Sequence, residues 1–208
     1  SFTLLSALKF KTPQLVALVN MADNGGSTGV LRDELGVLPP GDIRQCLVAL
    51  SNTPELRDLF NYRFTDGSLK GHAFGNLFLT ALEKMKVNFA EGVEFASQLL
   101  NITGVVEPVT LSDVTLKMRG PDGEIVEGEH NIGYSKFKLG EKSPEFWLDP
   151  SPETNPRAIT AINQADMVVI APGNLYGSLA PALIAPGIQK ALQTTKALKI
   201  YVCNLVTK

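Results

Sequence analysis

The sequence has 208 residues, of which 44% are hydrophobic and 19% are charged, and its formal net charge is −2. This composition predicts a globular protein, and the balanced charge excludes the broad basic surface with which nucleic-acid-binding proteins hold phosphates. No apolar run approaches the ~20 residues that span a bilayer, and two cysteines cannot form a disulfide framework.

Both cysteines, Cys46 and Cys203, lie in apolar runs. We therefore expect buried free thiols, which suit the reducing cytoplasm. The chain begins with a helical pattern that has no initiator Met, and it ends where a strand should enter a loop. We expect both ends to be truncated.

A strand followed by a glycine-rich loop is the stretch around which the chain is organised. Leu15–Val19 is apolar and predicts a strand, and the loop 23–29 follows it. A strand that ends in such a loop is where α/β proteins usually bind phosphates or nucleotides. Gly25 and Gly26 could equally form only a tight strand-to-helix turn, so the pattern leaves both interpretations open.

Residues 30–100 predict helices with recognisable starts. The run Pro39-Pro40-Gly41 predicts no helix before Asp42, which is placed as the N-cap of a capping box with Gln45. Pro54 marks the first position of the next helix, and Asn88 begins another.

The second half of the chain mixes two patterns. Alternating residues predict an antiparallel hairpin at about 105–134, and 135–153 is typical of an exposed loop. Asn155 is expected to cap a helix, strands are predicted at 167–171 and 198–203, and helical segments continue to 195. We therefore predict a single α/β domain over 1–208, with a doubly wound, mostly parallel Rossmann-like sheet and a small antiparallel hairpin excursion.

Three of the predicted strands end in polar loops, at 23–29, at 172–178 and after Asn204. In a parallel sheet these loops lie at one edge, so together they predict a composite site for a phosphate or nucleotide. Side chains that could hydrogen-bond a base, a sugar or a diphosphate are Asn20, Asn24, Asn76, Asn174, Asn204, Arg32 and Arg44.

Several candidate residues have two interpretations. Asp23 and Asp42 could meet Mg²⁺ beside a diphosphate, whereas Asp42 could also act only as a helix cap. His72 could be a general base or a phosphate contact, or it could be structural, and Tyr176 could contact ligand or only pack. No Walker lysine loop, nucleophile elbow or cysteine–histidine metal site is present, and His130 is expected at the surface.

Five motifs, taken in order, resemble the bacterial gluconeogenesis factor family, also called YvcK-like proteins. They are Ala22–Gly29, Leu38–Arg44, Gly71–Leu77, Leu99–Ile102 and Ala171–Tyr176. The resemblance spans nearly the whole chain and is weakest over 135–153. It implies a regulator that binds nucleotide sugars of the UDP-N-acetylglucosamine type and supports cell shape and growth on gluconeogenic carbon sources. Such regulators often form homodimers, although the pattern itself does not show an oligomeric state.

The resemblance also implies a set of ligand-binding residues. These are Asp23, Asn24, Gly25, Gly26, Ser27, Gly29, Asp42, Arg44, His72, Asn76, Gly173, Leu175, Tyr176 and Asn204. The sequence departs from the family where Asn24 stands in place of the usual Asp, which weakens a metal site with two carboxylates. Family members also usually carry a Gly-Gly-Gly-Thr-Gly loop just before Ser1, and this loop is absent from the sequence.

Two alternative functions remain. The family is related to 2-phospho-L-lactate transferase, which moves a phospholactyl group from a GDP-linked donor to a deazaflavin with Mg²⁺. Asp23 and Asp42 would then be the catalytic carboxylates, with Asp42 as the metal ligand. A dinucleotide-binding oxidoreductase is the other alternative, but the chain shows no glycine fingerprint followed by a placed acidic residue.

Overall fold

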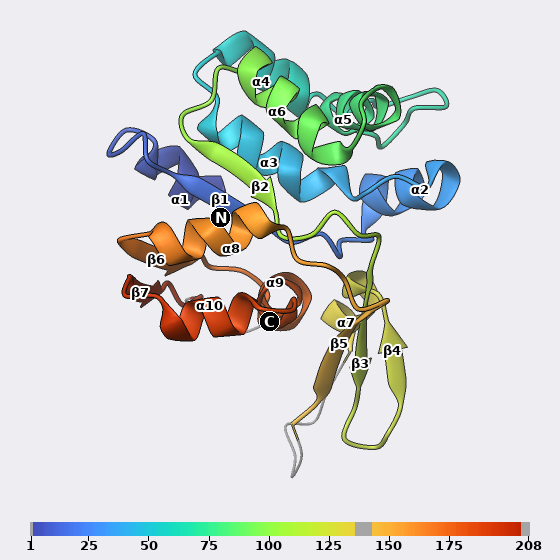
Figure 1. Cartoon of the computed structure of the whole chain (residues 1–208). Coiled ribbons are helices and arrows are strands. Elements are labelled where there is room, and N and C mark those ends of the chain that lie inside the picture. The colour runs from blue at the N-terminus through green and yellow to red at the C-terminus, as the bar shows by residue number, and fades with distance from the viewer. Residues whose placement is uncertain (1, 136–142, 205–208) are drawn as a thin grey trace. The chain divides into compact units, whose positions relative to one another are not determined.

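The computed structural model describes residues 2–135 and 143–204, and it confirms the predicted α/β, Rossmann-like class (Figure 1). The chain divides into two compact units. Unit 1 comprises residues 1–19 and 24–108, and unit 2 comprises residues 20–23 and 109–208.

Unit 1 is built around one buried helix. Its elements are α1 (Phe2–Leu8), β1 (Val16–Val19), α2 (Gly26–Leu35), α3 (Pro40–Leu50), α4 (Pro54–Asn61), α5 (Phe74–Met85), α6 (Phe89–Leu99) and β2 (Val105–Pro108). Helix α3 contacts each of the others, and Figure 1 shows it at the centre of this unit. Ile43, Leu47 and Leu50 on α3 are fully buried. A helix that is apolar on most of its surface has to lie in a core, which explains this position.

The predicted start of α3 at Asp42 is wrong. The helix begins at Pro40, and Pro39 at its N-cap makes no side-chain hydrogen bond. Proline fits the first helical position because the missing N–H would have no intrahelical partner there. Asp42 lies in the first turn instead of capping it, where its charge is favourable to the helix dipole.

Other predicted helix ends are confirmed. Asn88 accepts a hydrogen bond from the Glu91 N–H at 3.0 Å, and Pro54 is the first residue of α4. Asn155 accepts from the Arg157 N–H at 3.0 Å and begins α8. Asn88 and Asn155 each satisfy a backbone donor that the helix itself cannot, and Pro54 lacks the N–H that would need a partner.

Unit 2 contains a small antiparallel sheet and a parallel strand pair. Its elements are β3 (Thr115–Arg119), β4 (Ile125–Glu127), α7 (Glu129–Tyr134), β5 (Glu145–Asp149), α8 (Pro156–Gln164), β6 (Met167–Ile170), the π-helix η1 (Leu175–Leu179), α9 (Ala180–Ile184), α10 (Ile188–Thr194) and β7 (Leu198–Tyr201). Strand β3 pairs with both β4 and β5, and β6 pairs in parallel with β7.

The predicted hairpin excursion has different boundaries in the structure. Residues Val105–Pro108, expected in the hairpin, form β2, which pairs in parallel with β1. The antiparallel sheet starts at Thr115 and includes β5 at Glu145–Asp149, within the stretch predicted to be irregular. Strand β5 has only five residues, and the Lys, Glu, Pro and Ser residues around it give the stretch 135–153 the composition of a loop.

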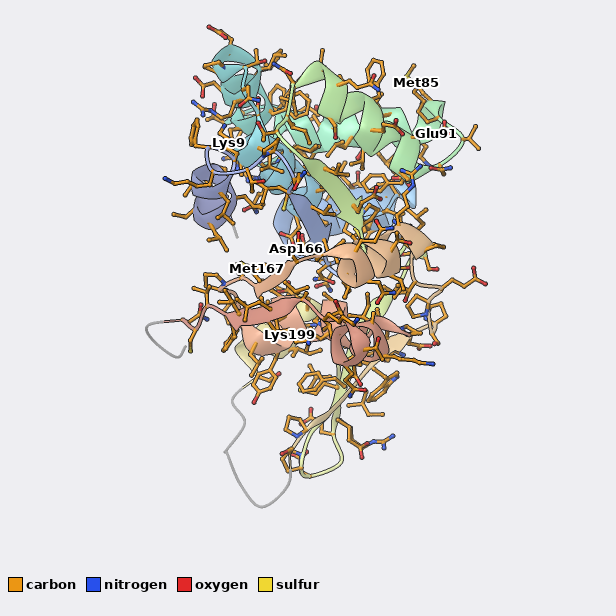
Figure 2. All side chains as sticks on the ribbon, turned by 60° about the vertical axis from the view of Figure 1, so that its left-hand side comes forward. Lys9, Met85, Glu91, Asp166, Met167 and Lys199 are labelled. Atoms are coloured by element: carbon orange, nitrogen blue, oxygen red, sulfur yellow. The ribbon has the colours of Figure 1, made fainter. Side chains whose placement is uncertain are left out.

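Several long side chains are solvent-exposed. Figure 2 shows Met85 and Glu91 near the turn that joins α5 to α6, and Met85 is 77% exposed. It also shows Met167 on β6, which is 52% exposed, and Lys199 on β7. None of the described helices is both long and apolar enough to cross a membrane.

The glycine-rich loop contains two positions at which glycine is required. Gly26 has a φ of +46°, and Gly29 packs so closely that a Cβ there would lie 2.3 Å from the carbonyl oxygen of Asn24. Real Cβ atoms do not approach an oxygen this closely. The turn into α2 therefore depends on Gly29 for space and on Gly26 for its backbone angle.

We predict that Gly29→Ala lowers the free energy of unfolding by about 1–3 kcal/mol, because the backbone must shift to relieve the overlap. Denaturant unfolding monitored by circular dichroism measures this. Gly133→Ala is the matched control, since its nearest neighbour lies 3.6 Å away and the residue is also helical. Equal effects of the two substitutions would contradict the steric account of Gly29.

Candidate functional site

A chain of side-chain hydrogen bonds joins three helices and a loop of unit 1. Arg44 on α3 donates from Nε to Oδ1 of Asn76 on α5, at 3.0 Å. Asn76 donates from Nδ2 to Oγ of Ser27 on α2, at 3.1 Å. That oxygen lies 3.0 Å from Nδ1 of His72. We call Ser27, Arg44, His72 and Asn76 the polar cluster, and all four were candidate ligand residues.

The absence of a side chain at Gly75 provides space for Arg44 of the polar cluster. A Cβ at Gly75 would lie 2.8 Å from Cδ of Arg44 and 2.8 Å from the carbonyl oxygen of Phe60. The absence of a side chain at Gly75 therefore lets the Arg44 side chain lie against the first turn of α5. Because Asn76 is the next residue, its amide is held where Arg44 can reach it.

His72 is fixed by the loop that leads into α5. Its carbonyl accepts from the Phe64 N–H at 3.0 Å, and its own N–H donates to the Leu69 carbonyl at 2.9 Å. Arg63 also donates to the Gly71 carbonyl. These hydrogen bonds hold together the loop between α4 and α5, and they place the half-buried His72 ring beside Ser27.

The Arg44 guanidinium is a positive charge in a largely buried position. The residue is only 7% exposed, and desolvation by burial, followed by the repulsion of Arg63, lowers its pKa while Asp42 opposes the shift. Its second partner is Oδ1 of Asn61, at 2.6 Å. Among the described residues no carboxylate forms a salt bridge with Arg44. The surroundings therefore carry excess positive charge, which favours an anionic ligand.

Asp42 influences a second group on the same helix. Burial raises the pKa of the Cys46 thiol to about 12, and the negative charge of Asp42 adds to this shift. Cys46 is therefore protonated at neutral pH and is a poor nucleophile. It is buried as predicted, whereas the same prediction is wrong for Cys203, which is exposed at the end of β7.

The Gly173–Ser178 loop of unit 2 is tied together by two asparagines. Asn174 accepts from the N–H groups of Tyr176 and Gly177 at 3.0 and 3.1 Å, so it caps η1. Asn204 donates from Nδ2 to the Gly173 carbonyl at 2.7 Å. The structure therefore brings the candidates Gly173, Tyr176 and Asn204 together.

Sequence reasoning missed the partners of this loop. The Phe146 ring stacks on Tyr176 with a centroid distance of 5.2 Å and an interplanar angle of 11°. Gly177 approaches Glu129 so closely that a Cβ there would lie 2.5 Å from its Oε1. Neither Phe146 nor Glu129 belongs to a motif, and both lie more than 25 residues away in sequence, so no local signal points to them.

The remaining candidates are distributed between the units. Asn24, Gly25, Gly26, Gly29 and Asp42 belong to unit 1 together with the polar cluster, and Asp23 and Leu175 belong to unit 2. Leu175 is exposed. Asn61 of α4, the second partner of Arg44, is a contact that sequence reasoning did not find.

The carboxylates of unit 1 determine which residues could hold Mg²⁺ there. Among the described residues no group of three or more His, Cys, Asp or Glu side chains could hold a metal ion. Protein sites for Mg²⁺ usually use one or two carboxylates together with substrate phosphates, so a preformed cluster is not required. In unit 1, Asp42 is the candidate that could supply such a carboxylate.

Comparison with known proteins gives a consistent family. The family described as 2-phospho-L-lactate transferase CofD matches residues 2–208 of the chain. A gluconeogenesis factor from Halalkalibacterium halodurans is 42% identical over 99% of this chain. Another from Listeria innocua is 39% identical over 98% of it. The chain spans 63% of the length of each of these relatives.

A solved structure supports the same relationship. A crystal structure of a protein from Bacillus halodurans matches 98% of this chain, with 41% sequence identity and a TM-score of 0.90. The match covers 65% of that protein's chain. At this identity and TM-score the two chains share their fold.

Proposed function

Because the chain belongs to the 2-phospho-L-lactate transferase CofD family, we propose that it binds a phosphorylated small molecule, specifically a nucleotide sugar of the UDP-N-acetylglucosamine type. The observation that carries this proposal is the polar cluster around the buried Arg44. A charged guanidinium whose protein partners are the neutral amides of Asn76 and Asn61 leaves positive potential for an anion.

The beginning of α2 supports the same ligand class. Its N-cap is Gly25, which makes no side-chain capping bond, and Ser27 of the polar cluster lies in its first turn. The N-terminus of a helix attracts phosphate through its backbone N–H groups and its dipole. Glycine at positions 25 and 26 would allow a phosphate to approach the backbone closely.

The protein is proposed to act as a cytoplasmic regulator of cell shape and of growth on gluconeogenic carbon sources. The gluconeogenesis factors among its relatives support this role. The high pKa of Cys46 removes one potential nucleophile from unit 1. Binding of the nucleotide sugar would then regulate the activity of the protein.

Calorimetry of the full-length protein tests this function. We expect UDP-N-acetylglucosamine to bind more tightly than GDP or NAD, and His72→Gln to weaken binding about 10-fold or more, the usual cost of a lost hydrogen bond to a charged group. His130→Gln, an exposed histidine on α7 of unit 2, is the matched control and should bind normally. Absence of binding at millimolar nucleotide sugar would overturn the proposal.

A phosphoryl-group transferase is the second candidate, and the CofD family match favours it. In this case Asp42 would hold Mg²⁺ against the diphosphate of a GDP-linked phospholactyl donor. When bound, Mg²⁺ would neutralise charge on the diphosphate. Arg44 and His72 would orient the transferred group, since catalysis of this type is mostly positioning and charge stabilisation.

Turnover of a GDP-linked phospholactyl donor with a deazaflavin acceptor tests the second candidate. If the protein is a transferase, Asp42→Asn should lower kcat by roughly 100-fold or more, the scale seen when a charge-stabilising group is removed. Asp58→Asn, an exposed carboxylate on α4, should leave kcat unchanged. An unmodified protein without turnover, or an Asp42→Asn variant with full turnover, contradicts this candidate.

A further inference from the structure

We infer that the hydrogen bonds of the polar cluster run in one fixed direction, from Arg44 through Asn76 and Ser27 to His72, and that this direction makes Nε2 of His72 a donor to the ligand. The direction from Arg44 to Ser27 follows from the donors and acceptors of the protein, and the direction from Ser27 to His72 is the inference. Only the last step, donation to a phosphate oxygen of the bound molecule, rests on the proposed function.

The first bond fixes the orientation of the Asn76 amide. An arginine side chain has donors and no acceptor, so the Asn76 atom that lies 3.0 Å from Arg44 Nε must be the carbonyl oxygen. The usual ambiguity between the amide oxygen and nitrogen is therefore removed. Because Asn76 is only 3% exposed, its NH₂ group is held toward Ser27 and cannot turn to solvent.

The second bond favours one direction for the Ser27 hydroxyl, although its oxygen has a second lone pair that could also accept. Its oxygen accepts from Asn76 Nδ2 at 3.1 Å, so its own proton must go to another acceptor. Among the described residues, the acceptor that the structure gives this proton is Nδ1 of His72, at 3.0 Å. A ring nitrogen that accepts carries no proton, so the neutral His72 ring has its proton on Nε2.

This tautomer determines what His72 can do. Within the described part of the chain, no protein group is bonded to Nε2, so Nε2–H can donate to a ligand oxygen. A donor suits the oxygen of a phosphate, and a protonated Nε2 cannot remove a proton from a hydroxyl group of the ligand. His72 therefore binds, and Arg44, Asn76 and Ser27 are positioning residues that act through it.

Histidine tautomers are read directly from the ¹⁵N shifts of the two ring nitrogens. We would label the full-length protein with ¹⁵N-histidine, record spectra without ligand at about pH 8, where an ordinary histidine is neutral, and assign His72 from the signals lost in His72→Gln. The expected result is a protonated Nε2 and an unprotonated Nδ1. A protonated Nδ1 in the unmodified protein would overturn the inference.

Asn76→Asp reverses the direction of the chain. A carboxylate cannot donate, so it would take the Ser27 proton, and the Ser27 oxygen would then accept from His72. Nδ1 of His72 should gain a proton. Asn61→Asp is the matched control, because it places the same charge beside Arg44 without touching Ser27 or His72. The tautomer should not change in this control.

Two further outcomes decide the inference. An Asn76→Asp protein that keeps Nδ1 unprotonated, or an Asn61→Asp protein that changes as much, contradicts it. If Asn76→Asp does not fold, Ser27→Ala replaces it, and loss of the hydroxyl should let a fraction of His72 move its proton to Nδ1. Added UDP-N-acetylglucosamine should shift the Nε2–H signal, and a lack of binding would count against the proposed function alone.

Discussion

The burial of one guanidinium is the constraint on which the candidate site of unit 1 depends. A buried charge needs hydrogen-bond partners, because taking it out of water costs several kcal/mol. Arg44 finds them in Asn76 of α5 and Asn61 of α4, two neutral amides. It therefore links three helices. Burial and the repulsion of Arg63 lower its pKa, and the negative charge of Asp42 opposes this shift.

Space and polarity are supplied by residues next to each other in the chain. Gly75 has no side chain, which leaves space for the Arg44 side chain beside it. Asn76, the next residue, accepts the hydrogen bond from Arg44 Nε. In the same way, Gly26 and Gly29 shape the turn into α2, and Ser27 between them carries the hydroxyl that meets His72. The glycine-rich loop is therefore important for placing a polar side chain as well as for its open backbone.

Much of unit 1 could be predicted from the sequence because its signals are local. The helix starts at Pro54 and Asn88 follow from capping chemistry, and the motifs contain all four residues of the polar cluster. The direction of the cluster could not be predicted, because it depends on which atom of Asn76 faces Arg44 after α3 and α5 have packed.

Other features were missed for physical reasons that can be named. Two successive prolines suggested that α3 starts at Asp42, but Pro40 is compatible with the first helical position. Strand β5 is short and partly polar, and it is stabilised by pairing with β3 instead of by its own pattern. The Phe146–Tyr176 stack joins residues 30 positions apart in the sequence, and no local sequence pattern predicts such a contact.

The central claim is that Arg44, besides contributing its positive charge, affects the ligand through the hydrogen bonds that lead to His72, with which it shares no direct bond. A double-mutant cycle tests it most directly, with nucleotide-sugar affinity measured for the unmodified protein, Arg44→Met, His72→Gln and the double variant below their thermal midpoints. If the polar cluster acts as one unit, the double variant should lose less affinity than the sum of the single losses, with a coupling of about 1 kcal/mol or more. Losses that add would contradict the claim.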